Sequence, residues 1–397
     1  MAGRSELTLE HWWYNPAMTD HIRTLPPEIV LQVLSYLSFD DLLAFGATCR
    51  LNYDHHLVSL RRLRLGVFER RVHSIISLLQ SGWSNPEQLI NSRDNGDQES
   101  SYTISVVYPQ SRAAKGESKR VHSTESRRRA SAQDTPRSQE QMIRLQNQIF
   151  TRVVHRYGPS LRHLEFMAYD LNLDGAAALG SKCQHTLKHL ALRFEHPHIR
   201  DGVIRPTTWQ TPAPASEAWN SLIGIGSRCK TSGLQNLETI ILERAGITPW
   251  QLMMLVKRNP GLLTLKLRTC RGARPEFLFW LGGINNDIDE VEGRSGEQTP
   301  VPPGAKLEVF WLEHCHRLLA HPIDESESPL DDEECDAGFE WVRGLKSLQS
   351  LSFSESANIP SELIDRANKA IWKIPDVILP YCLYDENSSI AVDPRWK

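Results

Sequence analysis

The sequence contains no long apolar segment and few cysteines. No run approaches the roughly 20 apolar residues that a membrane helix needs, and Glu6, Glu10, His11 and Asp20 interrupt any signal-like core before Leu25. The seven cysteines are scattered and form no CxxC pair. We therefore expect free thiols, no membrane partner, and a location in the cytoplasm and/or the nucleus.

The sequence also lacks the short motifs that mark common catalytic and nucleotide-binding sites. A Walker loop, GxGxxG, HExxH and GxSxG are all absent. His and Cys residues gather between Cys183 and His198 and in the triplet His314-Cys315-His316. Zinc needs four ligands that converge, whereas neighbouring side chains on a strand diverge. The prediction is a protein without catalytic residues, metal or cofactor.

Positive and negative residues nearly balance over the whole chain, but each sign is concentrated in one local stretch. The formal net charge of -3 gives no reason to expect a nucleic-acid partner. Residues 112–140 carry eight Lys/Arg against four Asp/Glu, and residues 324–336 carry eight acids and no base. Both stretches are typical of solvated loops, with docking surfaces as the alternative. Ser131 follows three arginines and is a candidate phosphorylation site, although a nuclear-import patch or plain linker has the same composition.

Composition and apolar periodicity divide the chain into five segments. The middle of the chain is rich in Ser, Arg, Gln and Asp, which favours disorder there. The predicted segments are a tail (1–20), a helical domain (21–65), a linker helix (66–92), a disordered basic linker (93–138) and a repeat domain (139–397).

The first apolar block, residues 25–50, predicts short amphipathic helices. Pro26-Pro27 suits a first helical turn, and Asp40 or Asp41 can cap a second helix. Such small helices cannot bury all their apolar residues among themselves, so some remain for a partner. The apolar residues that recur on one side of the first helix are Ile29, Val33, Leu34 and Leu37.

This block resembles the F-box family motif. The resemblance rests on the order LPxEIxxxVLxYLxxxDLL, followed by Cys49-Arg50. In that family a trihelical domain binds a Skp-type adaptor, which tethers it to a cullin and a RING subunit. The resemblance implies adaptor contacts at Leu25, Pro26, Glu28, Ile29, Val33, Leu34, Leu37, Leu42, Leu43 and Cys49.

A second pattern recurs in the C-terminal part and predicts repeated strands. Segments with the spacing LxxLxL, or a close variant, begin at residues 161, 187, 237, 262, 307 and 348. Helix-like segments lie between them, and strand, turn and helix in repetition form one solenoid unit. The arrangement resembles F-box/leucine-rich-repeat proteins, including many from filamentous fungi. The cysteine subclass of these repeats has a buried thiol where Cys270 and Cys315 stand.

The expected fold class is therefore α + α/β, with an N-terminal trihelical F-box and an irregular leucine-rich-repeat solenoid. Because side chains alternate along a strand, the residues between the leucines should form an exposed concave face. Trp311 would anchor a partner there or lie under an insertion, and Lys266 and Arg268 favour an acidic or phosphorylated segment. The predicted substrate contacts are His189, Arg193, Glu243, Lys266, Arg268, Trp311 and Glu313.

The predicted function is the substrate-recognition adaptor of a Skp–cullin–F-box ubiquitin ligase. It would bind a Skp-type adaptor through the F-box and a protein substrate through the repeats. The alternative is a non-degradative F-box/repeat scaffold. A nucleic-acid or phospholipid binder using residues 112–137 is a further rival, and it would show strong salt dependence.

Overall fold

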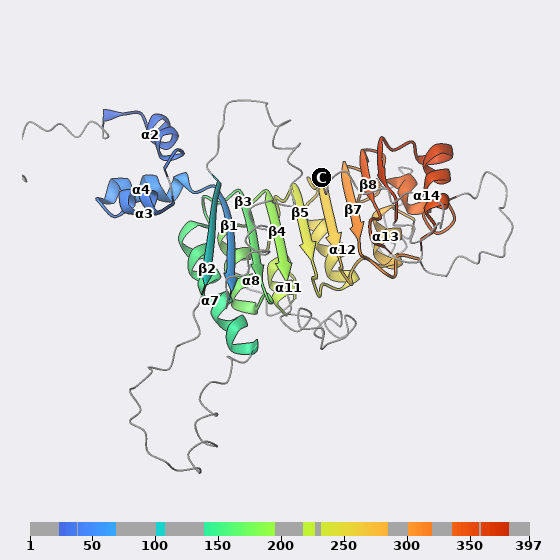
Figure 1. Cartoon of the computed structure of the whole chain (residues 1–397), viewed down its shortest axis with the longest axis horizontal. Helices are drawn as coiled ribbons and strands as arrows, with labels where there is room; N and C mark the ends of the chain where they lie inside the picture. The colour runs from blue at the N-terminus through green and yellow to red at the C-terminus, as the bar shows by residue number, and fades with distance from the viewer. Residues whose placement is uncertain are drawn as a thin grey trace, which may run out of the picture.

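The computed structural model describes residues 24–37, 39–68, 101–107, 139–194, 217–226, 232–284, 301–319, 336–356 and 359–380. Three short helices come first, followed by an α/β region built on a parallel sheet (Figure 1). Within the described residues, no helix is long and apolar enough to cross a membrane.

The N-terminal helices are α2 (Pro27–Leu34), α3 (Phe39–Gly46) and α4 (Arg50–Ser59). Pro26 caps α2 with an extended ψ of 141°, and Pro27 fits the first turn because that turn needs no backbone N–H there. The thiol of Cys49 caps α4 by accepting from the Asn52 N–H at 3.5 Å. The two helices predicted from residues 25–50 are confirmed, and α4 completes a trihelical unit.

Gly46 allows α3 to approach α4 closely. A Cβ at this position would lie 2.7 Å from the ring carbon Cγ of His56, which is shorter than real contacts permit. Because glycine has no Cβ, the buried His56 ring packs directly against the end of α3.

Over the part of the chain that the structure describes, the sheet has nine strands in the order β2-β1-β3-β4-β5-β6-β7-β8-β9, and every neighbouring pair is parallel. From β3 onward, the spatial order follows the chain order. The strands are β1 (Arg62–Phe68), β2 (Ser101–Val107), β3 (His163–Ala168), β4 (His189–Phe194), β5 (Thr239–Glu243), β6 (Thr264–Arg268), β7 (Val309–Glu313), β8 (Ser350–Ser352) and β9 (Asp376–Ile378).

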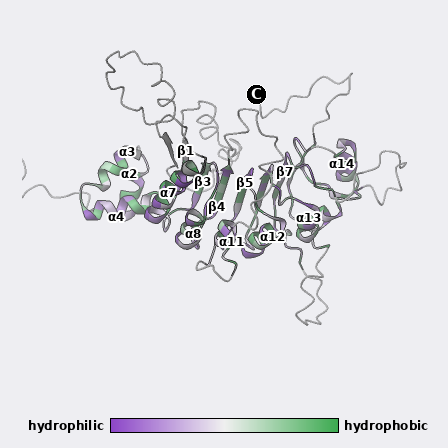
Figure 2. Ribbon diagram, turned by 90° about the horizontal axis from the view of Figure 1, so that it is seen from below, coloured by the Kyte–Doolittle hydropathy of each residue, from purple (hydrophilic) through white to green (hydrophobic). Residues whose placement is uncertain are grey.

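Helices cover one face of this sheet, as Figures 1 and 2 show. Between helices and sheet lies a continuous apolar core that holds the leucines of the six predicted patterns, such as Leu190, Leu265 and Leu312. Each predicted pattern overlaps one of the strands β3 to β8. The helical elements are α7 (Gln139–Tyr157), α8 (Leu173–Lys182), α11 (Glu217–Ile223), α12 (Pro249–Arg258), α13 (Pro275–Leu281), the 3-10 helix η5 (Glu340–Gly344), α14 (Ser361–Ala367) and the π-helical η6 (Asn368–Trp372).

The same turn follows four consecutive strands, β5 to β8. The residues at this turn have a positive φ: Arg244 (54°), Thr269 (53°), His314 (50°) and Glu355 (58°). The backbone N–H of Thr269 donates to the carbonyl oxygen of Glu313 at 2.9 Å, and Arg244 and His314 make the equivalent bond to the next strand. A left-handed conformation costs a non-glycine residue about 1 kcal/mol or more, which these inter-strand bonds help to offset.

Two predictions about the middle of the chain are wrong. Residues 66–68 end strand β1 and do not begin a linker helix. Residues 101–107, predicted to be disordered, form β2 and pair with β1 along their whole length. The sequence SYTISVV is rich in residues with strand preference, and a neighbouring strand satisfies its backbone groups. Ser131, the remainder of the predicted linker helix and most of the acidic stretch lie outside the described residues.

Candidate protein-interaction surfaces

Helix α2 presents apolar residues on two sides. Val30 and Leu34 point into the core and are almost fully buried. The other side carries Ile29 and Val33, and Leu25 and Tyr36 continue the same spacing just beyond the two ends of the helix. We call these four residues the α2 stripe. Their exposed fractions are 42%, 43%, 53% and 70%. A contiguous exposed apolar surface of this kind marks a protein-interaction site more often than a solvated face.

The structure separates the predicted adaptor contacts into two groups. Leu34 and Leu42 are buried in the chain's own core, so the prediction that they face a partner is corrected. Their burial follows from the packing of α4 against both α2 and α3. The predicted contacts that remain exposed or partly exposed are Leu25, Pro26, Glu28, Ile29, Val33, Leu37, Leu43 and Cys49.

Four further exposed apolar residues of the N-terminal helical region were not among the predicted contacts. Tyr36 belongs to the α2 stripe, and Leu51, Tyr53 and Val58 lie on α4. The spacing of Leu51 and Val58, seven residues apart on one helix face, is the signal that would have found them.

A hydrogen-bonded joint connects α4 to α7. The buried ring of His56 has Nδ1 3.0 Å from the carbonyl oxygen of Tyr53 and Nε2 3.2 Å from the hydroxyl of Tyr157. Because a carbonyl only accepts, Nδ1 carries the proton and Nε2 accepts from Tyr157. The Ser160 hydroxyl lies 2.7 Å from the carbonyl oxygen of Leu57. Burial lowers the pKa of His56, so the joint uses a neutral imidazole.

The residues between the core leucines lie on the opposite face of the sheet, but several are not exposed. Lys266 is 2% exposed and Trp311 is 7% exposed, and Arg193 and Glu313 are also buried. The Lys266 ammonium lies 3.4 Å from the centre of the Trp311 ring, and the indole N–H donates to the Ser350 hydroxyl at 3.0 Å. The expectation of an exposed Trp311 anchor is therefore wrong. Strands lie only about 4.8 Å apart, so large side chains in one row cover each other.

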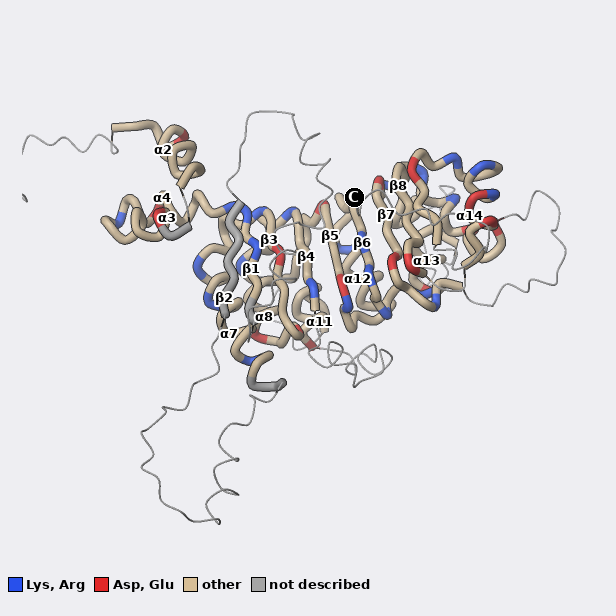
Figure 3. Tube along the Cα trace, in the orientation of Figure 1, with Lys and Arg blue, Asp and Glu red and all other residues tan. Residues whose placement is uncertain are grey.

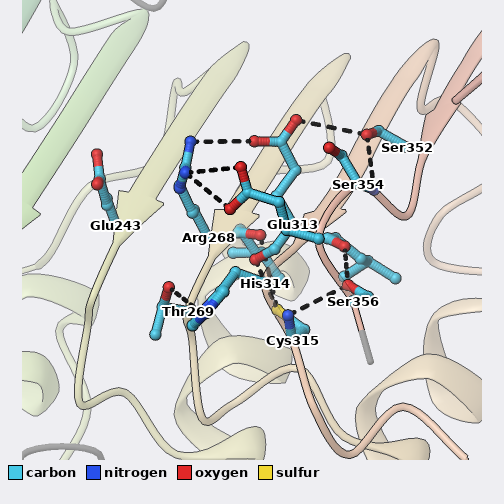
Figure 4. A network of polar contacts seen from close by, with 12 residues as sticks. Glu243, Arg268, Thr269, Glu313, His314, Cys315, Ser352, Ser354 and Ser356 are labelled. Atoms are coloured by element: carbon cyan, nitrogen blue, oxygen red, sulfur yellow. Dashed lines mark hydrogen bonds and ion pairs between the residues drawn. The ribbon is translucent and has the colours of Figure 1, made fainter. Parts of the chain in front are cut away.

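Charged residues form a row at the carboxyl ends of β4 to β7, and Figure 4 shows its part from Glu243 to Glu313. Arg268 is the centre of this row: Nη2 lies 2.9 Å from Glu355 Oε2, and Nη1 lies 3.8 Å from Glu313 Oε2. Arg193 Nε lies 4.0 Å from Glu243 Oε2. Four of the predicted substrate contacts thus form two ion pairs within the row, Arg193 with Glu243 and Arg268 with Glu313. The expectation that Arg193 and Glu313 are exposed is corrected, since both are buried and each is the more buried member of its pair.

His189 occupies a different row, near the start of β4. Its ring stacks on that of His163 from β3, with 5.4 Å between centres. Burial and then the positive charges of His163, Lys266, Arg64 and Arg193 lower the pKa of His189 to about 3. This residue is therefore a neutral, partly exposed member of the face and lies apart from the charged row.

The cysteines at the turns are internal. The thiol of Cys270 donates to the carbonyl oxygen of Leu242 at 3.1 Å, and Cys315 lies 3.7 Å from the carbonyl oxygen of Leu267. Burial raises the pKa of Cys315 to about 12 and raises that of Cys270 as well. The predicted burial of these thiols is confirmed. Among the described residues, no three His, Cys, Asp or Glu side chains gather in a way that could hold a metal ion.

Comparison with known proteins identifies the N-terminal region. A family model described as F-box-like matches residues 22–55, a segment that contains the α2 stripe and most of the three helices. No curated protein matches the chain at a significant level. The match supports the resemblance to the F-box family over this segment, and an F-box protein of this kind could bind a Skp-type adaptor.

Proposed function

We propose that this protein is the substrate-recognition subunit of a Skp–cullin–F-box ubiquitin ligase. The observation that carries the proposal is the α2 stripe, which exposes four apolar side chains within the F-box-like segment. Burying a large apolar side chain against a partner contributes about 1.5–3 kcal/mol, so a few anchors suffice for a specific contact. The partner at this surface would be a Skp-type adaptor and, through it, a cullin–RING ligase.

In this role the protein acts by proximity and has no catalytic residue of its own. The F-box would hold the ligase, and the sheet region would hold a protein substrate at a high effective concentration relative to charged ubiquitin carrier. The cytoplasm and the nucleus are the proposed sites of action, and neither nucleic acid nor membrane is a proposed partner.

We also propose that the α/β region is an irregular leucine-rich-repeat solenoid. Three observations support this: six leucine patterns that coincide with strands, strands in chain order, and helices on one face. Of the predicted substrate contacts, His189, Glu243 and Arg268 keep part of their surface exposed and remain candidates.

The test is direct binding of the purified full chain to a purified Skp-type adaptor. In the variant Ile29→Asp/Val33→Asp, two exposed anchors become charged while the buried side of α2 is unchanged. Losing one anchor commonly costs about 2 kcal/mol, so the affinity should fall by roughly thirtyfold per residue. Isothermal titration calorimetry measures this change.

The matched control is Leu173→Asp/Trp250→Asp, which charges two exposed apolar residues on α8 and α12. The control should bind the adaptor as the wild type does. Wild-type protein that binds no adaptor, or an Ile29/Val33 variant that binds equally well, contradicts the proposal. A complex that binds adaptor and cullin but leaves the lifetime of its partner proteins unchanged on deletion supports the scaffold instead.

A further inference from the structure

The strand β9 has one open edge. It ends the order of the described strands, and β8 is its one neighbour among them. The N–H of Asp376 donates to the carbonyl oxygen of Gln349 at 3.0 Å, and the carbonyl oxygen of Ile378 accepts from the N–H of Phe353 at 2.9 Å. Asp376 and Ile378 therefore direct these backbone groups toward β8.

Val377 directs its backbone groups to the other side. Backbone groups of successive residues in a strand point to opposite sides in the plane of the sheet, so the N–H and C=O of Val377 face away from β8. The side chains at this edge are also incompletely covered, since Leu379 is 38% exposed and Val377 is partly buried. An uncovered strand edge invites pairing with another chain, which proteins commonly prevent by covering it.

Contacts at both ends of β9 hold this edge in place. The side chain of Asn368 accepts from the N–H of Ile374 at 2.8 Å and donates to the carbonyl oxygen of the same residue at 3.2 Å. Beyond the strand, the carbonyl oxygen of Pro380 accepts from the Ser361 hydroxyl at 2.8 Å. Because the strand is already fixed, a segment that covers it would not have to order it as well.

The shortness of β9 favours an occupant from the same chain. The strand has three residues, and Pro375, directly before it, has no N–H to offer. A separate chain generally needs an interface of roughly 1,200 Å² or more for a stable complex. A tethered segment loses far less freedom on binding, so a few hydrogen bonds are enough to hold it.

Charge does not favour a partner of either sign at this end of the sheet. Figure 3 shows blue and red segments mixed around α14. Lys369 and Asp365 pair there at 2.6 Å. Because both signs are present, an acidic or a basic partner would gain little net attraction. Backbone hydrogen bonds and apolar contact therefore decide what binds at this edge.

The sequence that follows Pro380 has the pattern of a strand that returns toward β9. Residues 381–397 lie outside the described part of the chain. Residues 385–389, Asp-Glu-Asn-Ser-Ser, are rich in types that favour turns. Residues 390–392, Ile-Ala-Val, have β-branched side chains in alternation, and Pro394 then stops regular pairing. A turn at 385–389 would bring residues 390–392 back antiparallel to β9.

We propose that residues 390–392 pair with the open edge of β9 as an antiparallel strand. In this arrangement the N–H and C=O of Val377 both bond to one residue of the returning strand. The cover would keep the edge of the sheet from pairing with a second copy of the chain. This inference does not depend on the adaptor role and goes beyond it.

The test is hydrogen exchange of single amides in the full chain, resolved by electron-transfer fragmentation and mass spectrometry. The variant Ile390→Pro/Ala391→Pro disrupts the returning strand, because proline cannot donate within a ladder. The Val377 amide should exchange at least about tenfold faster in this variant than in the wild type. The Asp376 amide, which donates to β8, should exchange equally slowly in both.

The matched control is Arg395→Pro/Trp396→Pro, which makes the same kind of change beyond Pro394. Its Val377 amide should exchange as slowly as in the wild type. A wild-type Val377 amide that exchanges as fast as in an unfolded peptide overturns the proposal, and so does equal exchange in the Ile390/Ala391 variant. Slow exchange that disappears on dilution, with a dimer seen by sedimentation, would assign the edge to a second copy and also overturn it.

Discussion

The helical region and the sheet region use apolar residues in opposite ways. The three N-terminal helices are too small to bury all their apolar side chains, and they leave the α2 stripe exposed. The sheet region buries its leucines under the helices and places charged residues along its carboxyl edge. The comparison teaches that one chain can offer two unlike surfaces, one apolar and the other built from ion pairs of both signs.

The largest expected effect comes from the core of the sheet region. Phe310 is fully buried, and its ring meets that of Trp341 edge-on with 5.7 Å between centres. The variant Phe310→Ala should lose about 3–5 kcal/mol of the free energy of unfolding, because it leaves a cavity. Urea unfolding measures this loss, and Val301→Ala, at an exposed site, should change stability by less than about 0.5 kcal/mol. A small loss in Phe310→Ala would contradict the assigned core.

The next effect separates the two sides of α2. The variant Leu34→Ala should cost about 2–5 kcal/mol of stability, because Leu34 is buried in the core. The variant Ile29→Ala should leave stability within about 0.5 kcal/mol yet weaken binding of the Skp-type adaptor by up to roughly thirtyfold. Urea unfolding and calorimetric titration with the adaptor, performed on both variants, test whether the two sides of α2 have these different roles. If Ile29→Ala unfolds as easily as Leu34→Ala, the exposed side of α2 has a structural role.

The smallest effect concerns pH and the sheet face. The pKa of His189 in the folded chain is about 3, below its ordinary value of 6.5, so the unfolded state binds a proton that the folded state does not. The stability that comes from keeping His189 neutral is therefore fully present above pH 6.5, and it is lost as the pH falls from 6.5 toward 3. The stability difference between the wild type and His189→Asn should change by about 1.4 kcal/mol per pH unit between pH 6 and 4.

Measuring that difference cancels the titration of groups common to both proteins, including His56 and His314. Asp170, whose pKa is raised by burial, acts in the opposite direction and cancels too. A pH-independent difference would mean that His189 binds its proton equally well in the folded and the unfolded chain, which burial and its positive neighbours oppose.

Sequence patterns predicted which residues form the helices and strands better than they predicted which side chains are exposed. The leucine spacing located β3 to β8 because each pattern is local, and Leu265 with Leu267 already defines one face of a strand. The same alternation placed Lys266 on the other face but did not reveal its burial. Burial depends on Trp311, which stands on the next strand and 45 positions further along the chain.

The same limit explains the remaining differences. The strand β2 lies in a polar stretch, and its partner β1 precedes it by 39 residues at the paired positions Arg62 and Ser101. The sequence predicts that Ile29 and Leu34 are both apolar residues on the first helix. The position of α4 decides which of the two is buried. Local patterns therefore predicted which residues are apolar, and long-range packing decided which of them a partner can reach.

The short connection between α4 and β1 has a consequence for geometry. Only Leu60 and Arg61 separate Ser59 from Arg62, and the His56 joint ties α4 to α7 as well. The F-box-like helices are thus fixed to one end of the sheet, and each strand adds a step of about 4.8 Å away from them. In the proposed ligase, the strand at which a partner binds sets its distance from the F-box-like helices. The strand β6 is four strands from β1. A partner bound near β6 is therefore about 19 Å farther along the sheet than one bound at β1. Which lysines receive ubiquitin would then depend on the strand at which a substrate binds.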